Sequence, residues 1–127
     1  MKLSKAQAKV MEEAMGKIEF ARSVSFHDWV RKNVLFRIGE NRSFEFPSDK
    51  TDEEIDTLFK IADKVGGRYD RREFYEKRYS DIVNGIVDTY RVSSTTLRKL
   101  EALGLIEIIK DSCGEPYGSD TIKVLNI

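Results

Sequence analysis

The sequence predicts a mostly helical α+β fold with an N-terminal helical extension and a C-terminal β-hairpin. Apolar residues recur at helical spacing through most of the chain, and polar capping pairs stand at the expected helix starts. Near the C-terminus, a glycine is followed by two short β-branched segments, 105–110 and 120–126, with a polar loop between them. We therefore expect helices near 4–22, 51–65, 70–89 and 93–103, followed by a hairpin that pairs 105–110 with 120–126.

The first half of the chain carries clear start and stop signals. Ser4 with Gln7, and Thr51 with Glu54, each form a capping box in front of an apolar stripe. A short helix is expected at Phe26–Lys32. Between it and the helix at 51–65, the segments 34–38 and 43–46 flank Gly39-Glu40-Asn41, which favours a short hairpin that ends at Pro47.

The segment 70–89 is open to two interpretations. An apolar stripe runs through it without changing face, which favours one continuous helix. Alternatively, Ser80 caps a separate helix, Ser80–Asp88, and Thr89–Val92 forms a turn before the next helix. Within this region, Arg68–Tyr79 interleaves basic and aromatic residues. It is either an amphipathic helix with inward-facing rings or a surface for nucleic acid.

The segment 93–103 predicts a short amphipathic helix. Ser93 or Ser94 can cap it, and Gly104 supplies the left-handed conformation that ends many helices. On a helical wheel, three leucines share one arc, whereas the opposite side carries polar and basic residues. The leucines are Leu97, Leu100 and Leu103, and the opposite residues are Ser94, Thr95 and Arg98, flanked by Lys99 and Glu101.

The run TLRKLEALGLIE, Thr96–Glu107, resembles the recognition helix and first wing strand of winged helix-turn-helix DNA-binding domains. It is most similar to small winged-helix proteins of phages and mobile elements, and the likeness covers Ser80–Ile127. The resemblance implies a recognition helix at Ser93–Leu103 that enters the DNA major groove. It also implies a wing tip at Lys110–Asp120. The chain would then be a single domain, 1–127, with a helical extension at 1–67 and the winged helix-turn-helix at 68–127.

The function expected from this resemblance is binding of double-stranded DNA, as a small transcriptional regulator. Arg98 is best placed to read a guanine edge, and the basic residues around it can hold phosphates. The expected DNA-binding residues are Arg91, Ser94, Thr95, Arg98, Lys99 and Lys110.

Charge leaves an alternative open. Lys+Arg and Asp+Glu both total 22, whereas domains that hold phosphates are commonly basic. The wing tip is itself acidic, with Asp111, Glu115 and Asp120 against Lys110. The charge is unevenly placed, since residues 1–37 carry +4 and residues 38–67 carry −4. The alternative is a winged-helix protein-interaction module, such as a phage-encoded factor that binds a host protein. In either case the helix at 4–22 is the candidate contact for a homodimer.

Other function classes find little support in the sequence. No catalytic set can be assembled, so we expect no enzyme and no cofactor. His27 is the single histidine and Cys113 the single cysteine, so neither predicts a metal site. The acidic group at 49–56 lacks the spacing of a calcium loop. No apolar run is long enough for a membrane span, and one cysteine suits a reducing cytoplasm.

Overall fold

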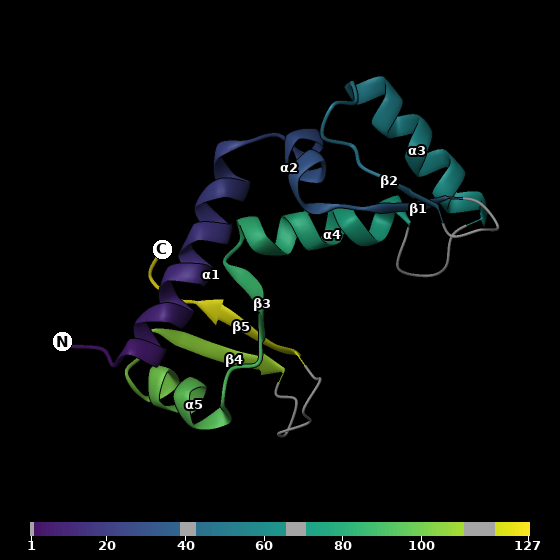
Figure 1. Ribbon diagram of the computed structural model, residues 1–127. Helices are drawn as coiled ribbons and strands as arrows, with labels where there is room; N and C mark the ends of the chain where they lie inside the picture. Colours follow the sequence, from purple (N-terminus) through teal and green to yellow (C-terminus); the bar gives the residue numbers. More distant parts are fainter. Residues whose placement is uncertain (1, 39–42, 66–70, 111–118) are drawn as a thin grey trace. The chain divides into compact units, whose positions relative to one another are not determined.

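The computed structural model describes residues 2–38, 43–65, 71–110 and 119–127. The fold is α+β, as predicted, and forms two compact units (Figure 1). The first unit joins Met1–Phe20 with Asp81–Ile127, and the second is Ala21–Ser80. The division expected from the sequence, at 67/68, stays a prediction, and the first of these units includes most of the N-terminal helix. The helices and strands are α1 (Lys5–Ser23), α2 (Phe26–Asn33), β1 (Phe36–Ile38), β2 (Ser43–Glu45), α3 (Asp52–Val65), α4 (Arg72–Val83), β3 (Ile86–Tyr90), α5 (Ser94–Ala102), β4 (Ile106–Lys110) and β5 (Ser119–Val124).

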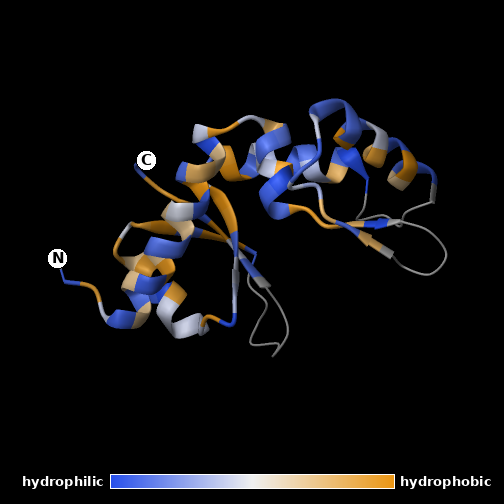
Figure 2. Ribbon diagram, turned by 45° about the horizontal axis from the view of Figure 1, so that its top comes forward, coloured by the Kyte–Doolittle hydropathy of each residue, from blue (hydrophilic) through white to orange (hydrophobic). Residues whose placement is uncertain are grey.

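Helix α1 begins at the predicted capping box. The Ser4 amide donates to Oε1 of Gln7 at 2.9 Å, and the Gln7 amide donates to Oγ of Ser4 at 3.2 Å. These two bonds satisfy N–H groups that the first helical turn leaves without a carbonyl. In the first unit, α1 buries Val10, Ala14 and Ile18, which recur at helical spacing along one face. Figure 2 shows the resulting orange and blue stripes on the helices.

A three-stranded antiparallel sheet forms a second part of the first unit's core. Its strand order is β3-β5-β4, so the C-terminal strand β5 lies in the middle (Figure 1). The register places Val87 opposite Ile122, and Ile122 opposite Ile108. Val87 and Ile122 are both buried, which makes this the core face of the sheet. The predicted pairing of 105–110 with 120–126 is confirmed.

The predicted helix over 70–89 is wrong beyond Val83. Residues 86–90 instead form β3, because Ile86 and Val87 pair with β5 and extend the sheet. Gly85 makes the change of direction with φ +88°, and its carbonyl accepts from the Val124 amide. The alternative helix Ser80–Asp88 with a turn at Thr89–Val92 is wrong for the same reason. A strand, not a helix, therefore precedes α5 directly.

Helix α5 matches its prediction closely. Ser93 is the N-cap, and its Oγ accepts from the Thr96 amide at 3.2 Å. Leu97 and Leu100 are buried on the inner face. Gly104 has φ +77°, the left-handed conformation expected just after the helix.

The second unit is built around aromatic side chains from three helices. Phe26 of α2 stacks on Phe59 of α3, with ring centroids 6.0 Å apart, and meets Tyr79 of α4 edge-on at 5.6 Å. The Tyr79 hydroxyl oxygen lies within hydrogen-bond distance of the carbonyl oxygens of Ala21 and Val24, at 3.1 and 2.7 Å. Tyr75 also meets the Phe59 ring, with centroids 6.1 Å apart. In the described part of Arg68–Tyr79, the tyrosines therefore pack inward, as expected for a helix with inward-facing rings.

The predicted short hairpin is also present in the second unit. Strands β1 and β2 pair antiparallel, with Phe36 opposite Glu45 and Arg37 opposite Phe44. Helix α3 packs on β1, where Phe36 meets Phe59 edge-on at 4.8 Å. The capping box of α3 is confirmed by reciprocal bonds between Thr51 and Glu54. Across the described residues, no helix has the length and hydropathy needed to cross a bilayer.

Candidate nucleic-acid interface

Helix α5 presents one polar stripe on the side opposite its buried leucines. Leu97 and Leu100 are almost completely buried, at 1% and 0% exposure, so they fix the helix against the core. The outward stripe follows the i, i+3, i+4, i+7 pattern, and all four of its side chains are exposed: Thr95, Arg98, Lys99 and Ala102. Ser94, at the edge of the stripe, is half-buried. The structure thus brings together four of the six predicted site residues on a single rigid element.

Arg91 lies in the sharp connection between β3 and α5. It has φ 56°, a left-handed conformation that is uncommon for a residue with a Cβ atom. The side chain is exposed, and its guanidinium carbon lies 5.2 Å from the ring centroid of Tyr90. Strained backbone is often found at functional positions. Two residues before the α5 N-cap, this conformation places a cation beside the start of the helix.

The start of α5 has the electrostatic character of an anion site. The first N–H groups of an α-helix have no carbonyl partner within the helix, and the helix dipole makes this end positive. Ser93 satisfies the Thr96 amide through its hydroxyl, and its Oγ also lies 2.8 Å from the hydroxyl oxygen of Thr96. The amides of Ser94 and Thr95 belong to this first turn. A phosphate at this end would meet a favourable field.

Glu101 plays a part that the sequence did not predict. It is the one acidic residue in the sequence of α5, and its Oε2 accepts from the Ile108 amide of β4 at 2.8 Å. The bond satisfies an amide on β4, which is an edge strand of the sheet. It also holds the carboxylate towards β4, so the exposed stripe of α5 keeps its positive charge. No periodicity signal could have indicated this contact, because it joins a helix to a strand seven residues later.

Lys110, the sixth predicted residue, lies on a different element. It is exposed at the end of β4 that is farther along the chain from α5, where the register is irregular and Lys110 pairs with Thr121. The Thr121 hydroxyl donates to Oδ1 of Asp88 at 2.8 Å on the neighbouring strand. The rest of the predicted wing tip up to residue 118, with Cys113, lies outside the described residues.

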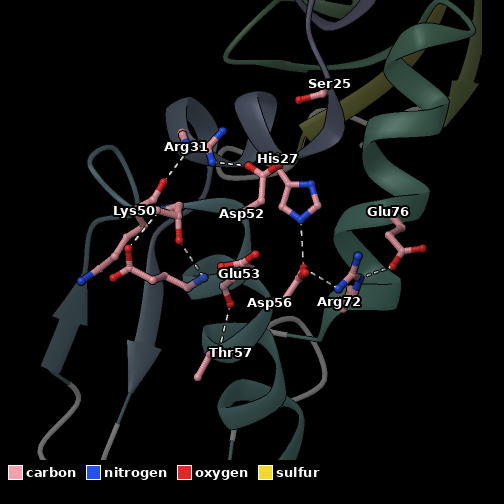
Figure 3. A network of polar contacts seen from close by, with 12 residues as sticks. Ser25, His27, Arg31, Lys50, Asp52, Glu53, Asp56, Thr57, Arg72 and Glu76 are labelled. Carbon is pink, nitrogen blue, oxygen red and sulfur yellow. Dashed lines mark hydrogen bonds and ion pairs between the residues drawn. The ribbon is translucent and has the colours of Figure 1, made fainter.

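The second unit contains a chain of polar contacts that joins its three helices (Figure 3). Nε2 of His27 on α2 lies 2.9 Å from Oδ1 of Asp56 on α3, and Arg72 of α4 donates to the same oxygen at 2.8 Å. Arg72 also donates to Glu76 at 2.6 Å. The hydrogen bond with His27, followed by that with Arg72, lowers the pKa of Asp56. Each member has a protein partner, so the chain of contacts stabilises helix packing.

Metal binding finds no support in the described residues. Among them, no three His, Cys, Asp or Glu side chains gather as a metal ion would require. The single histidine, His27, is engaged with Asp56 as described above. The polar stripe of α5 and the neighbouring Arg91 therefore remain the best candidate site in the described part of the chain.

Comparison with known proteins gives no independent identification. The chain matches no family model, no curated protein and no solved structure. The resemblance of Thr96–Glu107 to winged-helix proteins consequently stays a prediction, and the functional argument depends on the geometry of α5.

Proposed function

We propose that this chain is a DNA-binding protein, a small transcriptional regulator, that inserts α5 into the major groove of duplex DNA. The observation that carries the proposal is the exposed stripe of Thr95, Arg98 and Lys99 on a helix fixed by Leu97 and Leu100. A major groove is wide enough to admit one α-helix, and an anchored helix can present side chains there without the cost of ordering its backbone.

Each residue of this surface has a role that its chemistry suits. Arg98, in the middle of the exposed stripe, can donate two hydrogen bonds to O6 and N7 of a guanine. Lys99 on the same stripe and Arg91 before the helix are exposed cations and would hold phosphates. The first turn of α5, with Ser94 and Thr95, would accept a further phosphate at its amides.

The arrangement around α5 supports a winged-helix mode of binding. A strand, a helix and an antiparallel hairpin follow one another as β3, α5 and β4–β5, with β5 central in the sheet. The departure is that no helix stands between β3 and α5, where Arg91, Val92 and Ser93 alone connect them. In this proposal, β3 and the buried Leu97 and Leu100 orient α5, as the preceding helix does in a helix-turn-helix.

Competition binding to a pool of duplex DNA sequences tests the proposal. Arg98→Ala should lose about 1–3 kcal/mol of base discrimination, because it removes a contact with base edges. Lys99→Ala and Arg91→Ala should weaken binding to all duplexes alike and reduce the salt slope by about one each, because phosphate contacts release counterions.

Lys60→Ala is the matched control. Lys60 is an exposed lysine on α3 in the second unit, so the variant loses the same charge away from α5. It should bind as the unmodified chain does, and circular dichroism should show that every variant is folded. Undiminished duplex binding by Arg98→Ala, Lys99→Ala and Arg91→Ala together would contradict the proposal.

A protein-interaction module is the second candidate, and a specific observation favours it. Ile109 on edge strand β4 is 50% exposed, and Leu103 at the end of α5 is 42% exposed. Exposed apolar side chains on an edge strand suit pairing with another protein. If this is the function, Ile109→Lys should abolish capture of a protein partner by the tagged chain, whereas Arg98→Ala should leave that capture unchanged.

A further inference from the structure

The β1–β2 hairpin exposes aromatic rings on its outer face. Phe44 is 51% exposed and Phe46 is 68% exposed, whereas Phe36 on the inner face is 2% exposed. Leu35, which directly precedes β1, is 37% exposed. Phe44 lies within β2, and Phe46 follows one residue after the strand ends at Glu45. An apolar surface of this kind, left open on a charged protein, indicates a binding role.

Arg37 supplies a positive charge on this face. Arg37 is the cross-strand partner of Phe44, so both point to the outer face, and the guanidinium carbon lies 5.8 Å from the ring centroid. Glu45 is the partner of Phe36 and therefore points to the other side, where its Oε2 lies 4.0 Å from Nζ of Lys50. Among the described residues of the two strands, the outer face thus carries Phe44 and Arg37 and no carboxylate, and the exposed Phe46 follows directly after β2.

We propose that this outer face binds single-stranded nucleic acid, with bases stacked on Phe44 and Phe46 and a phosphate held by Arg37. Aromatic rings stack on any base, and a neighbouring cation attracts the backbone, which is the usual combination for single strands. The proposal does not depend on the duplex-binding role of α5, because it uses different residues in the other unit.

The exposed faces of the two rings explain why the ligand is a single strand. Bases in a duplex strand lie about 3.4 Å apart and cover one another's faces. Phe44 and Phe46 can each take a base only where the bases are unstacked. Duplex DNA offers no such faces along its length.

Anisotropy titrations of the full-length chain with fluorescein-labelled oligothymidylate test this proposal. Phe44→Ala and Phe46→Ala should each weaken binding about 10-fold, because each removes one stacking surface. Arg37→Gln should weaken binding and reduce its salt dependence. Phe44→Trp should retain the affinity, because it keeps an aromatic face.

The matched control is Ile109→Ala. Ile109 is as exposed as Phe44 but lies on the other hairpin, so the variant loses apolar surface without touching the proposed site. It should bind oligothymidylate normally. Arg98→Ala should also leave single-strand binding unchanged while it impairs duplex binding, which separates a failure of one proposal from a failure of the other.

Three outcomes would overturn the proposal. The first is no binding of oligothymidylate by the unmodified chain, and the second is unchanged affinity for it in the folded Phe44→Ala/Phe46→Ala double variant. The third is a dimer in sedimentation experiments that this double variant converts to a monomer without any change in oligonucleotide affinity. That result would identify a second copy of the chain as the occupant of the hairpin.

Discussion

Two antiparallel hairpins in the described part of the chain begin from similar sequence patterns and end as different surfaces. Strands β4 and β5 gain a third strand, β3, and bury Ile106 and Ile122 on one face of the resulting sheet. Strands β1 and β2 stay two-stranded and depend on α3, which covers Phe36, while Phe44 remains exposed. This comparison shows that alternation along a strand sets which side chains share a face. Whether that face becomes core or surface depends on a distant segment.

The largest change in unfolding free energy is expected when substitutions on the two faces of β1–β2 are compared. Phe36→Ala should cost about 3–5 kcal/mol of unfolding free energy, because it leaves a cavity against Phe59. Phe44→Ala should change stability by less than about 0.5 kcal/mol, because its ring is half-exposed. Urea denaturation of both variants measures the difference. Equal costs for the two substitutions would mean that the outer face is also part of a packed core.

The second prediction concerns Gly85, the residue at which the chain turns so that β3 can pair with the β4–β5 hairpin. Gly85 has φ +88°, and a Cβ atom there would lie 3.1 Å from Cδ1 of Ile127 and 3.3 Å from the Val124 carbonyl oxygen. Gly85→Ala should therefore destabilise the protein by at least about 1–2 kcal/mol. Gly16→Ala is the control, because α1 leaves open space around that position, and it should stabilise the helix by about 0.8–1.0 kcal/mol. If thermal unfolding shows that both substitutions change the stability in the same direction, this result contradicts the structure at Gly85.

A smaller loss of stability is expected from substitution of Glu101, whose carboxylate accepts a hydrogen bond from edge strand β4. Glu101→Ala removes the acceptor of the Ile108 amide and should cost about 0.5–1.5 kcal/mol in denaturation experiments. Glu107→Ala removes an exposed carboxylate from β4 itself and should cost less than about 0.5 kcal/mol. If the Glu107 variant proves the less stable of the two, the contact between α5 and β4 is not what holds this edge.

The smallest change in stability is expected for Asp56, which lies on helix α3 beside β1–β2. The lowered pKa of Asp56 means that its carboxylate stabilises the fold above the ordinary carboxyl pKa of about 3.9, and that this contribution disappears as pH falls through the lowered value. Because the Asp56 side chain is 39% exposed, solvent screening limits the contribution to about 1 kcal/mol at most. Asp56→Asn should thus be less stable than the unmodified chain near neutral pH. The gap should narrow below about pH 4 in urea titrations at several pH values.

Much of this structure is visible in local sequence signals, and the rest is decided by distant pairing. Capping pairs such as Thr51 with Glu54 and the stop at Gly104 correctly indicated helix boundaries. Strand β3 was missed because Ile82, Val83 and Ile86 also suit a helical stripe. Only the pairing of β3 with β5, more than thirty residues later in the chain, selects the strand.

The candidate site divides in the same way. The polar stripe of α5 follows from helical periodicity and was predicted as a set, including Thr95, Arg98 and Lys99. The left-handed conformation of Arg91 and the bond from Ile108 to Glu101 could not be predicted, because both depend on how β3 and β4 meet α5. Sequence therefore indicated which residues are exposed on the helix, and the tertiary contacts explain why the stripe stays positive.

An NMR titration of the ¹⁵N-labelled chain tests the central claim, that the exposed stripe of α5 contacts duplex DNA. On addition of a duplex at low salt, the largest amide shifts should fall on Ser94–Lys99 and Arg91, and added salt should reverse them. Amides of Phe44 and Phe46 should shift with oligothymidylate instead. A duplex that binds while leaving the α5 amides unmoved, or shifts that persist unchanged at high salt, would contradict the account.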